Sequence, residues 1–184
     1  MNDPVAVWHS EHLDFMRLLD LLEKQVAAFH MGDRPNYDLT RDIVYYLRHF
    51  PDRVHHPRED VAFDLLLKRH PAMQLQIDRL LQEHRVIAAA GEDVLRRLDE
   101  IAAEIFIARS TIEAAAATYL VYYRHHIATE EGKIMPLAAH LLTPKDWAAV
   151  AAAVPEAPDP LFSDHVEERY RELRRQIALE AQGS

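Results

Sequence analysis

Histidine and glutamate recur along this chain at spacings suited to binding metal ions. The pair Glu11-His12 is followed 72 positions later by Glu83-His84. Segment 53–60, RVHHPRED, is followed 71 positions later by segment 124–131, RHHIATEE, and both fit the pattern R-x-H-x-x-x-E-[D/E]. Each half of the chain therefore offers one histidine from a Glu-His pair and a second histidine from a His-x-x-x-Glu pair.

The spacing of these residues decides what chemistry they can do. A histidine and a glutamate four residues apart lie on one helix face, about 5–6 Å apart at Cβ. Two such helices and two further histidines can enclose one metal ion or two neighbouring ions inside a bundle. Nitrogen and oxygen donors without sulfur suit iron, manganese or zinc, and two carboxylates suit a metal pair because each can bridge.

A structural role for the same residues has to be weighed against the metal site. A single histidine on an apolar helix face is more often a hydrogen-bonded core residue than a ligand, and a single His-x-x-x-Glu pair also occurs on solvated faces. Four such features at matched spacing are different, because burying four histidines and two glutamates unpaired is costly. No equal number of lysines or arginines lies on the same helix faces to neutralise them.

The elements that position these residues are four long helices. Apolar residues repeat with helical period over residues 3–31, 39–69, 72–104 and 110–142. We expect Gly32 to end the first helix and Gly32–Asp38 to form a loop. We expect Pro51 and Pro57 to kink the second helix. Ser110–Glu113 is expected to form a capping box at the start of the fourth helix. Short connections and only 4 glycines favour an all-α fold, an antiparallel up-and-down four-helix bundle with short additional C-terminal helices.

The chain changes character after residue 142. Thr143 and Pro144 are typical of a helix start and open a short alanine-rich helix. Segment 154–160 contains three prolines and is expected to be a stiff linker, and segment 163–181 is expected to form a charged final helix. The sequence thus predicts a bundle over residues 1–142 and a helical extension over residues 143–184 that packs on it.

Composition excludes several classes of function. With 21 Lys+Arg against 30 Asp+Glu the formal net charge is -9, which argues against a nucleic-acid-binding protein. The 184 residues include no cysteine, which excludes thiolate metal sites, cysteine-ligated iron–sulfur clusters and cysteine nucleophiles. No apolar run is long enough to span a membrane and no secretion signal is visible, so we expect a cytoplasmic protein without membrane partners.

Together these motifs resemble the hemerythrin-like, or HHE cation-binding, domain over about residues 5–142. The resemblance is carried by Glu11-His12, segment 55–60, Glu83-His84 and segment 126–131, with Ile134-Met135-Pro136 following. It implies a four-helix bundle around two iron ions joined by an oxo or hydroxo bridge, with zinc or manganese as substitutes. It also implies a set of six metal ligands: His12, His55, Glu59, His84, His126 and Glu130.

The chain departs from the oxygen-carrying members of that family in its third helix. Those members take two histidines, one turn apart, from that helix, whereas Leu80 and Ala88 flank His84 here. Two octahedral irons have about twelve positions, and the six side chains with one bridging oxygen fill about ten, leaving about one open position on each iron. His56 or His125 could fill a position, or could instead form hydrogen bonds or face solvent. Tyr122 either lies by the site or, as we favour, fills the core.

These observations predict a cytoplasmic non-haem di-iron protein that binds O2 or another small diatomic or anionic ligand, or senses oxygen or iron. One alternative is a di-iron enzyme, oxidase-like, peroxidase-like or an iron-donating repair factor, with catalytic residues that the sequence does not identify. Another is a metal-regulated interaction module. The sequence also allows a homodimer. Asp60 and Glu131 either accept hydrogen bonds from ligand histidines or lie in solvent. Six histidines have no repeat partner and are expected at the surface or at helix caps: His9, His30, His49, His70, His140 and His165.

Overall fold

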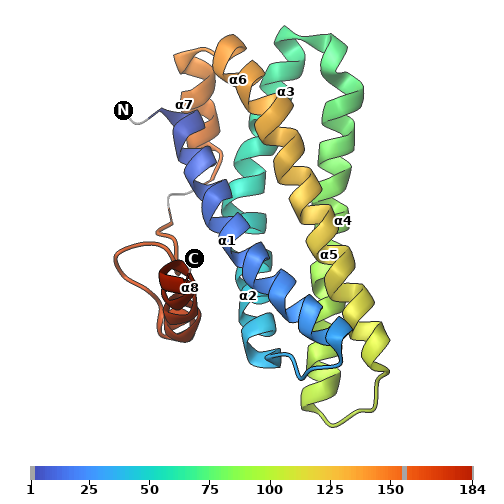
Figure 1. The fold of residues 1–184 in the computed structure, drawn as a ribbon. Coiled ribbons are helices and arrows are strands. Elements are labelled where there is room, and N and C mark those ends of the chain that lie inside the picture. Colours follow the sequence, from blue (N-terminus) through green and yellow to red (C-terminus); the bar gives the residue numbers. More distant parts are fainter. Residues whose placement is uncertain (1–2, 155–156, 184) are drawn as a thin grey trace.

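The computed structural model describes residues 3–154 and 157–183, and the regular structure in these residues is entirely helical. This confirms the predicted all-α class. The elements in chain order are α1 (Pro4–Met31), α2 (Tyr37–His49), η1 (Pro51–His55), α3 (His56–Arg69), η2 (Pro71–Met73), α4 (Gln74–Ala102), α5 (Arg109–Thr129), η3 (Glu130–Ile134), α6 (Met135–Leu141), α7 (Pro144–Ala152), η4 (Glu168–Tyr170) and α8 (Arg171–Gly183). Figure 1 shows α1, α2 with α3, α4, and α5 with α6 running side by side along the long axis of the bundle.

The first helix has the ends that its sequence predicts. The Asp3 carboxylate accepts a hydrogen bond from the Val5 amide at 3.1 Å, and Pro4 occupies the first turn, where its missing amide hydrogen costs nothing. Gly32 ends the helix in the left-handed conformation, with φ of 84°, and its amide bonds the Phe29 carbonyl. The loop that follows is shorter than expected, because the Asn36 side chain caps α2 and places Tyr37 inside that helix.

Two wide π-helical turns interrupt the bundle, one in the second long helix and one in the fourth. η1 begins at Pro51, as the predicted kink requires, and η3 is an interruption that the sequence analysis did not anticipate. Pro57 and Pro136 each follow one of these turns by two residues. A proline donates no hydrogen bond and its ring crowds the carbonyl four residues earlier, and a π-helical turn relieves both problems.

The start of the fourth helix differs from its prediction. α5 begins at Arg109, and no side chain caps it, so the capping box predicted at Ser110–Glu113 is wrong. The Arg109 guanidinium instead donates to the Phe29 carbonyl at 2.9 Å and the Ala28 carbonyl at 2.8 Å, which ties this end of α5 to the end of α1. The Glu113 carboxylate faces His30 at 3.2 Å and is not available to cap the helix.

The C-terminal segment begins as predicted and then diverges. Thr143 and Asp146 form a reciprocal capping box at the start of α7. The final helix α8 begins at Arg171, after the short 3-10 turn η4, and not at Ser163, because the Asp159 carboxylate accepts hydrogen bonds from the Leu161 and Phe162 amides and holds a turn there. Leu161, Tyr170 and Leu173 are buried, and α8 lies against α1 and α2 (Figure 1). Part of the predicted linker 154–160, residues 155–156, lies outside the described residues.

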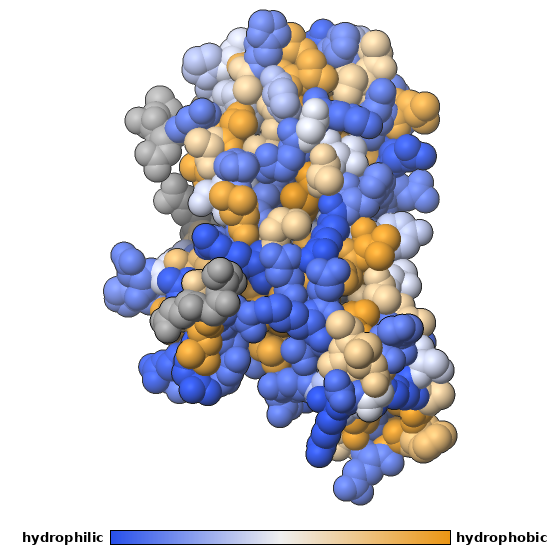
Figure 2. All heavy atoms as spheres, viewed as in Figure 1, coloured by the Kyte–Doolittle hydropathy of each residue, from blue (hydrophilic) through white to orange (hydrophobic). Residues whose placement is uncertain are grey.

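The core consists of two apolar clusters with a polar layer between them. One cluster includes Phe15 and Tyr46, and the other includes Trp8 and Phe63. His12 lies between Trp8 and Phe15 along α1, so the boundary between the two clusters passes through the predicted ligands. Hydrophilic residues are interspersed with hydrophobic ones on the face shown in Figure 2. None of the described helices combines the length and the apolar character needed to cross a membrane.

Candidate metal centre

The structure brings the six predicted ligands together in the interior of the bundle. His12 lies on α1, His84 on α4 and His126 on α5, while His55 and Glu130 lie in the two π-helical turns and Glu59 on the first turn of α3. All six side chains are buried. His84 is the most exposed of them, at 8%, so the cluster has almost no access to bulk water.

The two glutamates lie between the histidines of the two halves. Glu59 Oε1 is 3.0 Å from His55 Nε2 and 3.5 Å from His12 Nε2, and Glu59 Oε2 is 3.5 Å from His84 Nε2. Glu130 Oε1 is 3.1 Å from His126 Nε2, and Glu130 Oε2 is 3.5 Å from His12 Nε2. Each carboxylate therefore faces nitrogens from both halves, which is the arrangement that a bridging ligand needs.

Several polar atoms of this cluster have ion-pair neighbours but no partner in hydrogen-bond geometry within the described chain. These atoms are Glu59 Oε2, both carboxylate oxygens of Glu130, and the Nε2 atoms of His84 and His126. A buried polar atom left without a partner costs about 1–3 kcal/mol, and a buried charge costs more. Metal cations would satisfy all five atoms at once, so the donor set fits a metal centre.

A second layer of carboxylates holds the opposite nitrogen of each histidine. Two of these carboxylates act within one half of the chain: Glu11 lies 2.6 Å from His55 Nδ1, and Glu83 lies 3.2 Å from His126 Nδ1. A hydrogen bond from Nδ1 to a carboxylate fixes the ring and leaves Nε2 as the donor to a metal. The glutamate of each Glu-His pair therefore positions a ligand on the next helix of its own half.

The other two outer carboxylates connect the halves. Asp60 lies 2.9 Å from His84 Nδ1, and Glu131 lies 2.7 Å from His12 Nδ1. Of the two roles open for Asp60 and Glu131, the structure supports the hydrogen bond to a histidine. Sequence reasoning missed the roles of Glu11 and Glu83, although their repetition beside a histidine was the signal that pointed to them.

The carboxylates control the charge of the histidines. Burial lowers the pKa of His55, but Glu59 and Glu11 outweigh it and raise that pKa to about 10. Burial is likewise outweighed at His84, where Asp60 and the two buried glutamates raise the pKa to about 11, and at His126, where Glu130 and Glu83 raise it to about 9. Burial raises the pKa of Glu59, but the facing histidines hold it well below its usual range. Without metal, the raised pKa values keep His55, His84 and His126 as imidazolium groups facing carboxylates.

His56 is a fifth histidine in the cluster, and His125 is not. Donor atoms of His56, Glu59, His84 and His126 lie within 4.8 Å of one another, as do those of His12, His55 and Glu59. The His56 ring is buried and stacks on His84, with centroids 4.3 Å apart. His125 is 64% exposed and reaches only the Glu83 carboxylate, at 3.9 Å.

The tyrosine nearest the cluster is Tyr123. Tyr122 is 44% exposed, so its predicted core-filling role is wrong. The Tyr123 ring is buried 6.1 Å from the His56 ring, and its hydroxyl has no partner among the described residues. Tyr122 lies four residues before His126 and Tyr123 lies three before it, and either spacing places a side chain on the same helix face.

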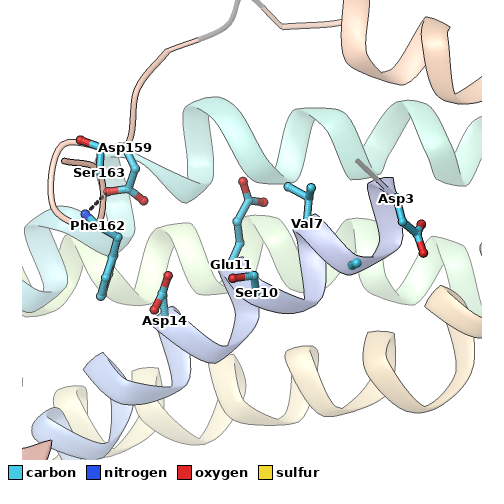
Figure 3. Close-up of a pocket in the computed structure, with 9 residues that line it drawn as sticks. Asp3, Val7, Ser10, Glu11, Asp14, Asp159, Phe162 and Ser163 are labelled. Atoms are coloured by element: carbon cyan, nitrogen blue, oxygen red, sulfur yellow. Dashed lines mark hydrogen bonds between the residues drawn. The ribbon is translucent and has the colours of Figure 1, made fainter. Parts of the chain in front are cut away.

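A surface pocket of about 570 Å³ reaches one of the outer carboxylates. It lies between α1 and segment 159–163, and Glu11, Asp14 and Asp159 line it (Figure 3). Arg58 approaches Glu11 at 3.7 Å, while the other oxygen of Glu11 bonds His55. Glu11 therefore lies between the open surface pocket and the buried His55 ring.

Five of the six histidines without a repeat partner lie at the surface, as predicted: His9, His30, His70, His140 and His165. His9 bonds Glu131 at 2.9 Å, and His70 also caps the end of α3. His49 is partly buried, and its ring stacks on Tyr45 with centroids 3.6 Å apart.

Comparison with known proteins adds one finding. A family model described as the hemerythrin HHE cation binding domain matches residues 3–138 of the chain. No curated protein and no solved structure matches the chain.

Proposed function

The chain belongs to the hemerythrin HHE cation-binding family, and on that premise we propose that it is a non-haem di-iron protein that binds O2 or another small diatomic or anionic ligand, or senses oxygen or iron. The observation that carries the proposal is the set of five buried donor atoms without a hydrogen-bond partner in the described chain. Nitrogen and oxygen donors of this kind suit iron, and zinc or manganese could substitute for it.

The donors divide into two groups that share two carboxylates. His12 and His55 would hold one metal, with Nε2 atoms that approach to 2.9 Å, and His84 and His126 would hold the other. Glu59 and Glu130 lie between the groups and would contribute to both metals. Bound iron would supply a site for a small ligand and one-electron redox chemistry.

Hydrogen bonds and packing within the chain orient the proposed ligands without a metal. The four outer carboxylates accept Nδ1 protons, fix each ring and keep Nε2 directed toward the cluster. Phe15 packs edge-on against His55 with centroids 5.1 Å apart, and Phe63 packs against His84 at 6.1 Å. These apolar rings exclude water, so a small ligand would compete with little solvent.

Metal analysis of protein from iron-supplemented cells tests the proposal. We expect about two iron ions per chain in the natural sequence and a strong loss in His55→Ala and in His126→Ala. His30→Ala is the matched control, because His30 is exposed and lies outside the cluster. Retention of the full iron content by both cluster variants would refute the ligand assignment.

A second measurement separates the functional alternatives. Ferrous protein exposed to O2 should form a persistent adduct if it binds or senses O2, and should turn over rapidly to the ferric form if it is an oxidase-like enzyme. The cytoplasmic location, the homodimer and the absence of nucleic-acid partners stay predictions from the sequence.

A further inference from the structure

We propose that His56 is an additional metal ligand on the His84–His126 side of the centre, and that Asp52, Arg48 and Gly91 position it. The proposal rests on the proposed function, because it assigns a donor to one of the two metals. His56 is not among the six predicted ligands, because the position that corresponds to it in the second repeat is occupied by Ile127.

The geometry of His56 matches that of a ligand. Its side chain is buried in the interior, and a ring nitrogen lies within 4.8 Å of donor atoms of Glu59, His84 and His126. The ring lies nearly parallel to His84, at 17°, and nearly perpendicular to His126, at 88°. His56 therefore lies beside His84, whose neighbours one turn away on α4, Leu80 and Ala88, supply no donor.

The opposite side of the His56 ring is held by a carboxylate of its own. His56 Nδ1 lies 3.0 Å from Asp52 Oδ1, four residues earlier, in an ion-pair contact without hydrogen-bond geometry, so Nδ1 faces this carboxylate and Nε2 is the nitrogen left for a metal. Asp52 in turn forms an ion pair with Arg48, another turn earlier. The other four cluster histidines have a carboxylate hydrogen-bonded to Nδ1, whereas Asp52 faces His56 Nδ1 as an ion-pair neighbour. Among the described residues, Asp52 is the only one of these five carboxylates with an arginine ion pair closer than 3.5 Å.

Gly91 makes room for the arginine. It lies in the interior of α4, where glycine weakens a helix relative to alanine. A Cβ atom at this position would lie 2.5 Å from Arg48 Cδ, 2.9 Å from Arg48 Cγ and 2.9 Å from Tyr119 Cε2. A larger residue would therefore displace Arg48 or Tyr119, and with Arg48 the partner of Asp52.

The assignment makes the two metal sites unequal. The His84–His126 side would have three imidazoles, and the His12–His55 side would have two. The six predicted ligands leave about one coordination position open on each iron. His56 would fill the open position on the His84–His126 side, so a small ligand would bind on the His12–His55 side.

Zinc titration of the full-length protein tests the inference with a redox-inert ion. Calorimetry and equilibrium dialysis should show two zinc ions in the natural sequence. In His56→Ala we expect one of the two binding steps to weaken by about a hundredfold, and in Asp52→Asn and Gly91→Ala by about tenfold, with the other step within twofold. Asp93→Asn is the matched control, because Asp93 forms a partly buried ion pair with Arg97, outside the cluster and at the same four-residue spacing.

Two further readouts distinguish a ligand from a structural residue. The visible spectrum of the cobalt-substituted protein should change in His56→Ala and not in Asp93→Asn, and added imidazole should restore the second zinc step in His56→Gly. Asp52→Asn decides the case if neither His56 variant folds. Two undiminished zinc steps in the folded variants would overturn this inference and leave the proposed function standing, whereas fewer than two zinc ions in the natural sequence would overturn both.

Discussion

Metal binding should release about three protons at pH 7. The pKa values of His55, His84 and His126, about 10, 11 and 9, lie at least two units above pH 7, so each ring carries a proton on both nitrogens in the metal-free protein. A metal replaces the proton on Nε2, while Nδ1 keeps its hydrogen bond to an outer carboxylate. Burial holds the pKa of His56 well below its usual range, so His56 contributes no proton.

Calorimetry in buffers of different ionisation enthalpy measures this number directly. The observed enthalpy of zinc binding, plotted against the buffer ionisation enthalpy, should have a slope of about three protons for the fully loaded protein. The logarithm of the overall binding constant should also rise by about three for each pH unit near pH 7. Glu11→Gln removes the carboxylate at His55 Nδ1 and should reduce proton release, whereas Glu168→Gln, at an exposed position outside the cluster, should not.

The same pKa values determine how the stability of the metal-free protein depends on pH. A histidine whose pKa is raised by folding stabilises the folded state fully below its unfolded pKa of about 6.5, and this contribution disappears as the pH rises through the folded value. The free energy of unfolding without metal should therefore fall between about pH 6.5 and 11. A slope of zero or one proton in the calorimetric plot would refute the reasoning, because the three rings would then be neutral or would not bind metal.

Three other predictions concern stability. Metal-loaded protein should melt at a higher temperature than metal-free protein at pH 7. At a free metal concentration of 100 Kd, each site should stabilise the folded protein by about 2.7 kcal/mol. Equal melting temperatures would show that the centre does not stabilise the bundle. Arg109→Ala should lower the free energy of unfolding by about 1–3 kcal/mol in urea titrations, because it removes the hydrogen bonds to the Phe29 and Ala28 carbonyls. Arg85→Ala, at an exposed position of α4, should change the free energy of unfolding little, and equal effects of the two substitutions would contradict the anchoring role of Arg109. Tyr46→Phe should lower the free energy of unfolding by about 1 kcal/mol, because the hydrogen bond to Asp159 is lost. Tyr123→Phe should leave the free energy of unfolding unchanged or raise it, because the Tyr123 hydroxyl has no partner in the described chain. The reverse order would show that bound water satisfies the Tyr123 hydroxyl.

Local spacing in the sequence predicted much of the fold and of the site. Helical periodicity depends only on neighbours within a turn or two, so it located the long helices to within a few residues. His55 and Glu59, or His126 and Glu130, share a helix face wherever that helix lies in space, because four residues make about one turn. The twofold repeat then indicated that both pairs belong to one site, and the structure brings them together.

Helix starts were less predictable where the cap comes from another part of the chain. Thr143 and Asp146 are three residues apart and cap α7 as predicted. Ser110 and Glu113 have the same spacing, yet Arg109 anchors α5 by reaching the carbonyls of α1, about 80 positions earlier. A capping motif is therefore informative only when no tertiary contact competes for its residues.

Which of two adjacent histidines faces the centre was decided by tertiary structure alone. His56 follows the predicted ligand His55, and His125 precedes the predicted ligand His126, so the local sequence does not distinguish them. Successive side chains on a helix point about 100° apart, so the rotation of each helix against its neighbours determines which one turns inward. Packing and the π-helical turn at residues 51–55 place His56 against His84, whereas α5 directs His125 to solvent. The sequence determined which residue types the site contains, and the arrangement of the helices determined how many of them face the metals.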